Sequence, residues 1–337
     1  MITHSVRERA VLAALALANR APSVHNSQPW SWELGEHSVH LYADARRWLP
    51  ATDPHGRDLL LSCGAALHHL RVALAALDFH PKVHRLPNPA VPDHLAAVEL
   101  RRGASTERDL VMAGMLEKRR SDRRRFSSRS VPEAYLRALS TRAGAEGALL
   151  LRTDDPIDRD RLVTAIETAA AVQDATDGYA VEISTWSGQH TGPDGVPSAN
   201  VPAPRPEPSR SVDLPMRRYA DGELDQPDPE SPDGAVILAL GTAGDDRLSQ
   251  LRAGEAASAV LLQATELGLA SSVLSQPLEI AFTRRFVRDR VLGGALCPQL
   301  LFRIGWLPAG AAAIPATPRR PVKETMVRPP KDWAGAD

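Results

Sequence analysis

Two long segments of the chain place apolar residues at alternating intervals of three and four positions. This spacing puts the apolar side chains on one face of an α-helix, with a repeat of about 3.5 residues. Helices with such a repeat pack against each other at a shallow angle, although each could instead pack on its own sheet. The apolar positions are Leu60, Cys63, Leu67, Leu70, Leu74 and Leu77 in the first segment, and Ala253, Ala257, Val260, Ala264 and Leu267 in the second.

The two segments also indicate an internal duplication. A shift of 190 positions superposes five identical pairs: Arg57 and Arg247, Gly64 and Gly254, Ala66 and Ala256, Leu77 and Leu267, and Val83 and Val273. Each helix follows a predicted strand, at 39–42 and 236–240, and precedes two more, at 82–86 and 96–100 and at 272–275 and 299–305. Repetition of whole units is stronger evidence than a shared helical period. We therefore expect two related halves, 1–105 and 106–337, with the long helices as a central spine.

The first twenty residues allow two interpretations. A polar start, nine apolar residues at 10–18 and the pair Asn19-Arg20 would suit a signal peptide. Val11, Leu15 and Ala18 also share one face of a helix, and nine apolar residues are too few to span a bilayer. We favour a core helix, because the loop that follows needs an anchored helix before it.

Proline dominates two regions that have little periodic apolar content. Ten prolines lie between Trp186 and Gly234, which excludes a regular helix or a central strand there. The first half has no counterpart of residues 187–232, so this segment is interpreted as an insertion that could form a lid. Residues 308–337 are also rich in proline and alanine, and they predict an extended C-terminal arm.

Composition and charge narrow the function classes. The 337 residues are 43% hydrophobic and 24% charged, which is typical of a globular protein of one large domain or two domains. A formal net charge of −1 gives no general attraction to nucleic acid or to an anionic membrane. Cys63 and Cys297 are too few for a disulfide framework, so we expect a cytoplasmic protein.

Common catalytic and metal signatures are missing. The sequence has no G-x-G-x-x-G, no Walker loop, no G-x-S-x-G and no C-x-x-C. His68 and His69 are adjacent on a predicted helix and point about 100° apart, so they cannot chelate one ion together. Pro81 breaks the helical spacing of His80 and His84. A metal site is therefore not expected.

Two other segments present polar groups that suit a small molecule. Residues 21–30 read Ala-Pro-Ser-Val-His-Asn-Ser-Gln-Pro-Trp, a loop with hydroxyl and amide side chains held between two prolines. Such a loop suits a flat heteroaromatic with donors and acceptors on its edge, or it is simply capped by its own side chains. Residues 118–125 carry six positive charges, which suit a phosphate; a nucleic-acid patch or a solvated helix end are the alternatives.

These segments resemble motifs of the flavin-dependent nitroreductases. Residues 21–30 match the pattern A-P-S-x-x-N-x-Q-P-W, and residues 119–126 are similar to the family's R-R-S-x-R…F motif. The run Glu266-Leu-Gly-Leu-Ala-Ser, followed by Val273-Leu-Ser-Gln, is similar to its G-L-G-S segment, and Pro318-Arg-Arg-Pro resembles its C-terminal R-x-P motif. The likeness covers most of the chain outside 187–232.

One departure from the ordinary family is informative. A standard nitroreductase subunit carries both main motifs, and each flavin lies between two subunits. Here the first half has the A-P-S motif without Arg-Arg-Ser, and the second half has Arg119-Arg-Ser without A-P-S, since residues 140–146 read Ser-Thr-Arg-Ala-Gly-Ala-Glu. The halves are complementary and can build one flavin site. This resemblance points to the Acg-like branch, whose chain is a fused pseudo-dimer.

The resemblance implies a nitroreductase-like α+β fold, with two mixed sheets around packed central helices, and one FMN per chain. It implies that Arg119, Ser121, Arg319 and Arg320 hold the FMN phosphate, and that Arg123 lies near the pyrimidine edge of the ring. Pro22, Ser23 and Asn26 would contact the ring and the ribityl chain, and the backbone of Ser275 and Gln276 would face N5. Gln28 and Arg120 complete the implied set of cofactor-binding residues. No side chain is expected to do the redox chemistry, because the flavin supplies it.

Two functions follow from this resemblance. The first is a reductase that passes hydride from NAD(P)H through FMN to a nitroaromatic or quinone-like acceptor, acting as a monomer. The second is a flavin-binding or flavin-storing protein with little turnover, in which residues 187–232 cover the ring. Nucleic-acid binding through residues 119–125 is the weaker third alternative, since the chain is neutral and has few aromatic residues.

Overall fold

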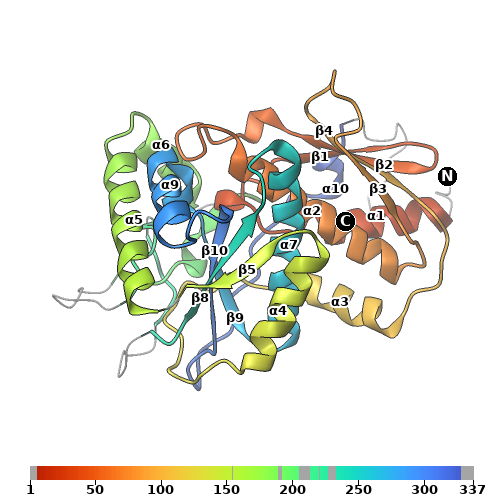
Figure 1. The fold of residues 1–337 in the computed structure, drawn as a ribbon. Coiled ribbons are helices and arrows are strands. Elements are labelled where there is room, and N and C mark those ends of the chain that lie inside the picture. The colour runs from red at the N-terminus through yellow and green to blue at the C-terminus, as the bar shows by residue number, and fades with distance from the viewer. Residues whose placement is uncertain are drawn as a thin grey trace.

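The protein is built from two four-stranded sheets with two long helices between them (Figure 1). The computed structural model describes residues 6–153, 155–188, 192–204, 213–219, 221–226 and 233–327. The first sheet contains β1 (Trp30–Leu34), β2 (Ser38–Ala43), β3 (Lys82–Arg85) and β4 (His94–Glu99). The second contains β5 (Leu149–Arg152), β8 (Val236–Thr242), β9 (Ala270–Leu274) and β10 (Cys297–Gly305).

Both sheets have the same topology. The strand orders are β1-β2-β4-β3 and β5-β8-β10-β9, and every neighbouring pair in them is antiparallel. The expectation of mixed sheets is therefore wrong for these eight strands. The strand before each long helix and the strand after it, β2 and β3 or β8 and β9, do run parallel to each other, although they are not neighbours. The last strand of each half then inserts between those two strands and pairs antiparallel with both.

The long helices α2 (Arg57–Ala76) and α7 (Arg247–Glu266) pack directly against each other (Figure 1). They cross where Gly64 of α2 meets Gly254 of α7. A Cβ atom on Gly64 would lie 2.1 Å from the carbonyl oxygen of Leu251, and one on Gly254 would lie 2.1 Å from that of Leu61. The contact is reciprocal, because the shift of 190 positions that relates the two glycines also relates Leu61 to Leu251. The backbones therefore meet at a local pseudo-twofold axis.

The first half packs one face of its sheet on helices. Helix α1 (Val6–Ala18) buries Val11, Leu15 and Ala18, the three residues that the sequence placed on one face, in the same core as Trp30 and Leu41 of the sheet. Helix α2 is long and apolar enough to cross a membrane, but 78% of its apolar window is buried inside the protein. Its apolar character is that of a helix packed between two sheets.

The second half covers both faces of its sheet. Helix α4 (Glu133–Ala145) and α7 pack on one face, and α5 (Pro156–Asp174) and α9 (Ala281–Arg290) pack on the other. All seven residues of β8 are buried, which explains its continuous apolar sequence. The remaining described elements are α3 (Glu107–Lys118), α6 (Tyr179–Thr185), α8 (Gln276–Glu279), α10 (Val322–Thr325), β6 (Ser187–Gly188), β7 (Val196–Pro197) and the 3₁₀ turns Val24–Asn26, Ala45–Arg47 and Ser198–Asn200.

The arm that follows β10 returns from the second half to the first sheet. Met326 forms a parallel bridge with Trp32, and α10 lies beside β1 (Figure 1). The side-chain amide of Asn19, just after α1, donates to Thr325 Oγ1 at 3.0 Å. The arm therefore ties the two halves together a second time, away from the helix crossing.

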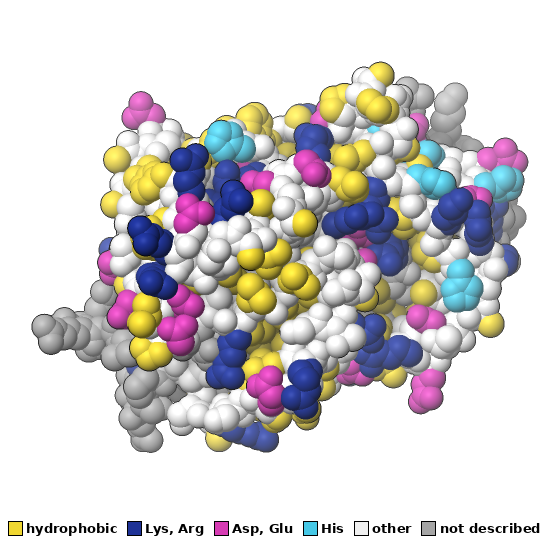
Figure 2. All heavy atoms as spheres, viewed as in Figure 1, with side chains coloured by type: hydrophobic (Ala, Val, Ile, Leu, Met, Phe, Trp, Pro, Cys, Tyr) yellow, Lys and Arg dark blue, Asp and Glu magenta, His cyan; other side chains and the backbone are white. Residues whose placement is uncertain are grey.

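Over the face shown in Figure 2, acidic and basic side chains are interspersed.

Replacing Gly64 or Gly254 with alanine should lower the free energy of unfolding by roughly 1–3 kcal/mol, the usual range for overpacking a core. The reason is that the added methyl group meets a backbone carbonyl that cannot move independently of its helix. Urea unfolding followed by circular dichroism measures the change. The matched control is Gly114→Ala in α3, where a Cβ would meet nothing within 4 Å. That control should gain up to about 1 kcal/mol from helix propensity. Equal responses of the variants would contradict the close crossing.

Candidate functional site

Two adjoining pockets lie where the halves meet, and they share Pro22, Ser23, Ser121 and Arg123. Their empty volumes, which include the open space at their mouths, are about 570 Å³ and about 730 Å³. We call the first the arginine pocket; it is also lined by Arg20, Asn26, Leu116, Arg119, Arg120, Val196, Thr317 and Arg319. We call the second the serine pocket; it is also lined by Val24, His25, Asp58, Leu61, Ser62, Ala65, Tyr219, Ala257, Leu261, Ser272, Val273, Ser275 and Leu300.

The loop of residues 21–30 presents one wall of both pockets from a strained backbone. His25, Asn26 and Gln28 have φ values of 47°, 55° and 50°, in the left-handed region that costs energy for residues with a Cβ. The turn is held because Ser23 Oγ accepts from the backbone N–H of Gln28 at 3.0 Å. Its far end is anchored by Trp30, whose indole N–H donates to Asn19 Oδ1 at 3.0 Å. Strain supported in this way is common at binding sites.

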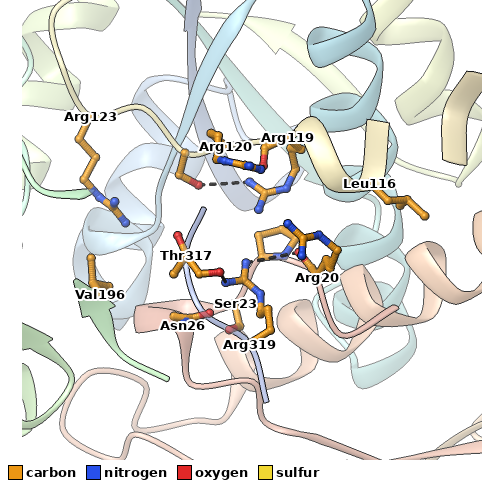
Figure 3. Close-up of a pocket in the computed structure, with 12 residues that line it drawn as sticks. Arg20, Ser23, Asn26, Leu116, Arg119, Arg120, Arg123, Val196, Thr317 and Arg319 are labelled. Carbon is orange, nitrogen blue, oxygen red and sulfur yellow. Dashed lines mark hydrogen bonds between the residues drawn. The ribbon is translucent and has the colours of Figure 1, made fainter. Parts of the chain in front are cut away.

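The arginine pocket gathers positive charge from three separated segments. Arg20 comes shortly after α1, Arg119 directly follows α3, and Arg319 comes from the C-terminal arm (Figure 3). Their side chains point toward one another, with Arg120 beside Arg119 (Figure 3). Arg119 donates to Ser121 Oγ at 3.4 Å, and Arg319 donates to the backbone oxygen of Arg20 at 3.3 Å. Aspartate and glutamate are absent from the described lining.

These arginines carry an unbalanced charge. Burial, followed by repulsion from neighbouring arginines, lowers the pKa of Arg119 to about 10 and that of Arg319 to about 9. The Nε atoms of Arg20, Arg119 and Arg319 are buried without a hydrogen-bond partner. A buried donor without a partner destabilises a protein by about 1–3 kcal/mol, and by more when it is charged. The pocket is therefore built for an anion that accepts from several guanidinium groups, as a phosphate does.

The serine pocket has apolar walls and a polar rim. Leu61 and Ala65 of α2 and Ala257 and Leu261 of α7 supply apolar surface from the two central helices. Hydroxyl groups come from Ser23, Ser62, Ser121, Ser272 and Ser275. Apolar walls with a few polar groups on the edge are the usual environment of a flat heteroaromatic ring.

Arg123, Tyr219 and His25 form one end of the serine pocket. The Arg123 guanidinium lies 5.0 Å from the centre of the Tyr219 ring and donates to the backbone oxygen of Asn200 at 3.3 Å. The Tyr219 hydroxyl is 3.4 Å from His25 Nδ1, and the two rings meet edge to face. Burial, followed by the charges of Arg217 and Arg123, lowers the pKa of His25 well below its usual value. His25 is therefore neutral at neutral pH.

The described parts of the segment 187–232 lie against these pockets. Val196 lines the arginine pocket and Tyr219 lines the serine pocket. The backbone oxygen of Gly195 accepts from the Asn26 amide at 2.9 Å, and that of Pro193 accepts from the Gln28 amide at 2.8 Å. The segment is thus joined to the loop of residues 21–30 by hydrogen bonds.

Most residues that the sequence suggested for cofactor binding line one pocket or both. These are Pro22, Ser23, Asn26, Arg119, Arg120, Ser121, Arg123, Ser275 and Arg319. The other three lie outside the described linings. Gln28 Oε1 accepts from the backbone N–H of Arg320 at 2.8 Å, and the Arg320 guanidinium donates to the backbone oxygens of Gln28 and Glu324. Gln276 is buried and donates to Gln173 at 2.9 Å.

Several lining residues were not foreseen from the sequence. Arg20 directly precedes the motif of residues 21–30, so its charge beside that loop was the available signal. His25 occupies a variable position of the motif, and Tyr219 lies in the proline-rich segment. Asp58 and Ser62 occupy the first two turns of α2, where acidic and hydroxyl residues are ordinary. Their presence in the serine pocket depends on how α2 is placed in space.

Comparisons with known proteins give relatives over nearly the whole chain. No family model matches the chain. It is 43% identical over 332 residues to "Putative NAD(P)H nitroreductase Rv3131" of Mycobacterium tuberculosis, covering 98% of this chain and 94% of the relative. It is 36% identical over 325 residues to "Putative NAD(P)H nitroreductase acg" of the same organism, covering 94% and 95% of the two chains.

A solved structure with a related name is more distant. The FMN-dependent nitroreductase NfnB from Mycobacterium smegmatis, in complex with NADPH, is 18% identical, with a TM-score of 0.36. The match covers 61% of this chain and 93% of that one. The family is shown by the curated relatives, whose identity extends through both halves. The chain belongs to the nitroreductase superfamily, in its Acg-like branch.

Proposed function

We propose that this protein is an FMN-dependent oxidoreductase that passes hydride from NAD(P)H through the flavin to a nitroaromatic or quinone-like acceptor. The observation that carries the proposal is the arginine pocket, whose buried unpartnered donors call for a phosphate, beside a pocket suited to a flat ring. The names of the curated relatives support the same activity. Bound FMN would supply the two-electron chemistry, and the chain would bind and orient the reactants.

The phosphate would be held by Arg20, Arg119, Arg120 and Arg319, with Ser121 as a hydroxyl donor. Arg20 replaces Arg320 in this proposal, because Arg20 lines the arginine pocket with an unpartnered Nε atom, whereas Arg320 lies outside both described linings. The ring would lie in the serine pocket, with Arg123 at its polar end. A cation there favours an electron-rich reduced ring, by the same electrostatics that stabilise any developing negative charge.

One site per chain is supported by what occupies the related positions in the other half. The shift of 190 positions relates Ala65 of the serine pocket to Glu255, and relates Leu261 to Arg71. Glu255 is fully buried and accepts from Arg71 at 2.8 Å and from Arg85 at 2.6 Å. An ion network therefore fills the space where the first site has apolar wall. We infer one FMN per chain, in a monomer that needs no partner subunit to complete the site.

A flavin-storing function is the second candidate, and the hydrogen bonds of the segment 187–232 favour it. A segment joined to Asn26, Gln28 and Arg123 at the edge of both pockets would hinder the entry of nicotinamide. The reductase requires this segment to open or to leave one ring face free. A cytoplasmic location stays a prediction for either function; Cys63 and Cys297 are both free thiols.

The purified protein should carry one FMN per chain, measured from flavin absorbance against protein concentration after reconstitution. Light scattering should give the mass of a monomer with flavin retained on dilution. Two flavins per chain would contradict the inference that the ion network of Glu255 prevents a second site. No flavin after reconstitution would contradict the proposed cofactor.

Arg20→Ala, Arg119→Ala and Arg319→Ala should each weaken FMN binding by roughly 1.5–3 kcal/mol, the range for a charge-assisted hydrogen bond. The same variants should not lower the thermal stability of the flavin-free protein, because each removes repulsion within the cluster. Flavin fluorescence titration and thermal unfolding measure the two effects. Arg101→Ala, which removes an exposed partner of Glu99, is the control and should change neither. Unchanged FMN affinity in all three pocket variants would place the phosphate elsewhere.

Tyr219→Ala should speed the anaerobic reduction of the flavin by NADPH, because Tyr219 is part of the segment that lines the serine pocket. Stopped-flow absorbance records the bleaching. Tyr42→Ala, which removes a ring stacked on His94 in the first sheet, is the control and should leave the rate unchanged. Rapid bleaching of the wild type that Tyr219→Ala does not increase would support an open reductase. Bleaching only in the variant would support storage.

A further inference from the structure

Asp58 lies in the serine pocket with an oxygen that has no partner. It is in the first turn of α2, it is 4% exposed, and its Oδ2 is buried without a hydrogen bond. Within the described lining of both pockets it is the one acidic residue. A buried carboxyl oxygen without a partner destabilises the fold, so its retention calls for a role in the pocket.

Two acidic residues near Asp58, Asp53 and Glu279, already have hydrogen-bond or ion-pair partners. Asp53 accepts the backbone N–H groups of Arg57 at 2.8 Å and Leu59 at 2.9 Å, which stabilises the start of α2. Glu279 of α8 accepts from Ser275 Oγ at 2.7 Å and is paired with Arg217. Both serve the structure around the pocket, whereas Asp58 faces the space where a ligand would lie.

The surroundings of Asp58 keep its proton on. Burial raises its pKa well above the usual value, and the charges of Asp53 and Glu279 raise it further. The charges of Arg57 and Arg217 lower it in part. The other titratable or charged groups that face this region are His25, Arg123 and Tyr219 in the pocket and Arg284 of α9.

We infer that the carboxyl group of Asp58 donates the proton that the acceptor takes up when it is reduced in the serine pocket. This inference rests on the proposed function. Reduction of a quinone to a hydroquinone adds one hydride and one proton. Bound FMN, once reduced by NAD(P)H, would supply the hydride. The O–H bond of Asp58 breaks, its proton goes to the acceptor oxygen, and the electron pair stays on the carboxylate, which solvent then protonates.

His25 and Tyr219 are poorer sources of this proton. His25 is neutral, and its two ring nitrogens face Thr52 Oγ1 and the Tyr219 hydroxyl, each at 3.4 Å. An ordinary phenol is a weaker acid than an ordinary carboxyl group by several orders of magnitude. A carboxylic acid whose pKa is raised toward the working pH is the better general acid, and such a group typically contributes about 10²–10⁴ in rate.

The kinetic test uses the FMN-loaded protein, reduced anaerobically with dithionite and mixed with benzoquinone while flavin reoxidation is followed. The wild-type rate should fall as pH rises, because Asp58 loses its proton. Asp58→Asn should be slower by about 10²-fold at low pH and should show no such fall. The control Asp53→Asn should keep the fall but shift it to lower pH, because one charge that raises the pKa of Asp58 is gone.

The second readout is thermal unfolding of the flavin-free protein between pH 3 and pH 9. Asp58 has a folded-state pKa above its unfolded value of about 3.9, so the wild type loses stability as pH rises from the unfolded toward the folded pKa. Asp58→Asn stays neutral and should be more stable than the wild type above this interval. A purely structural aspartate would give the opposite result, since its loss would lower stability.

The outcomes separate the inference from the function on which it rests. If the wild type is reoxidised by the quinone and Asp58→Asn matches it in rate and pH profile, Asp58 is not the donor and the reductase stands. If the wild type binds no flavin or is not reoxidised, the proposed function fails, and the inference fails with it. A variant that is less stable than the wild type at every pH also overturns the inference.

Discussion

The close crossing of α2 and α7 determines where the two sheets, and the pockets between them, are placed. At Gly64 and Gly254 any Cβ would lie 2.1 Å from a carbonyl oxygen of the opposite helix, so the backbones are as close as glycine allows. Along the chain, each helix connects two strands of its own sheet. The position of the helix therefore fixes the position of that sheet. The distance between the helices in turn sets the gap that Ala65 of α2 and Leu261 of α7 both line.

Around this crossing the backbone is nearly symmetric, but the side chains are not. The sheets share one topology, yet Ala65 and Leu261 leave open space in one half, while Glu255 and Arg71 close the related space in the other. The buried carboxylate of Glu255 is satisfied by two arginines, which makes its burial tolerable. A duplicated fold can in this way keep two cores and a single ligand site. At the related positions of the other half, the ion network of Glu255 occupies the space instead.

The sequence predicted those features that depend on local periodicity or on a continuous motif. The helix pairing followed from the apolar spacing, and the nitroreductase-like α+β fold is confirmed by the relatives. The antiparallel order of each sheet was missed, because the insertion of β4 and β10 leaves no local pattern. Arg320 and Gln28 carried the right chemistry for a ligand but bond to each other's backbone, a choice made by tertiary contact. Tyr219 and Asp58 had no signal, since one lies in an aperiodic segment and the other reads as an ordinary acid at a helix start.

The two pockets bury ionisable groups of opposite type, arginines in one and a carboxyl group in the other, and both arrangements indicate ligands. The arginine pocket crowds positive charge that an anion would balance, and so the flavin-free protein should be less stable than the loaded one. The serine pocket holds a carboxyl group whose ionisation is disfavoured by its burial and then by the charges of Asp53 and Glu279. A fold selected for stability alone would pair these groups, as it has paired Glu255 with Arg71 and Arg85. The contrast between that satisfied network and these two unsatisfied pockets is the physical reason to assign binding and chemistry to this junction.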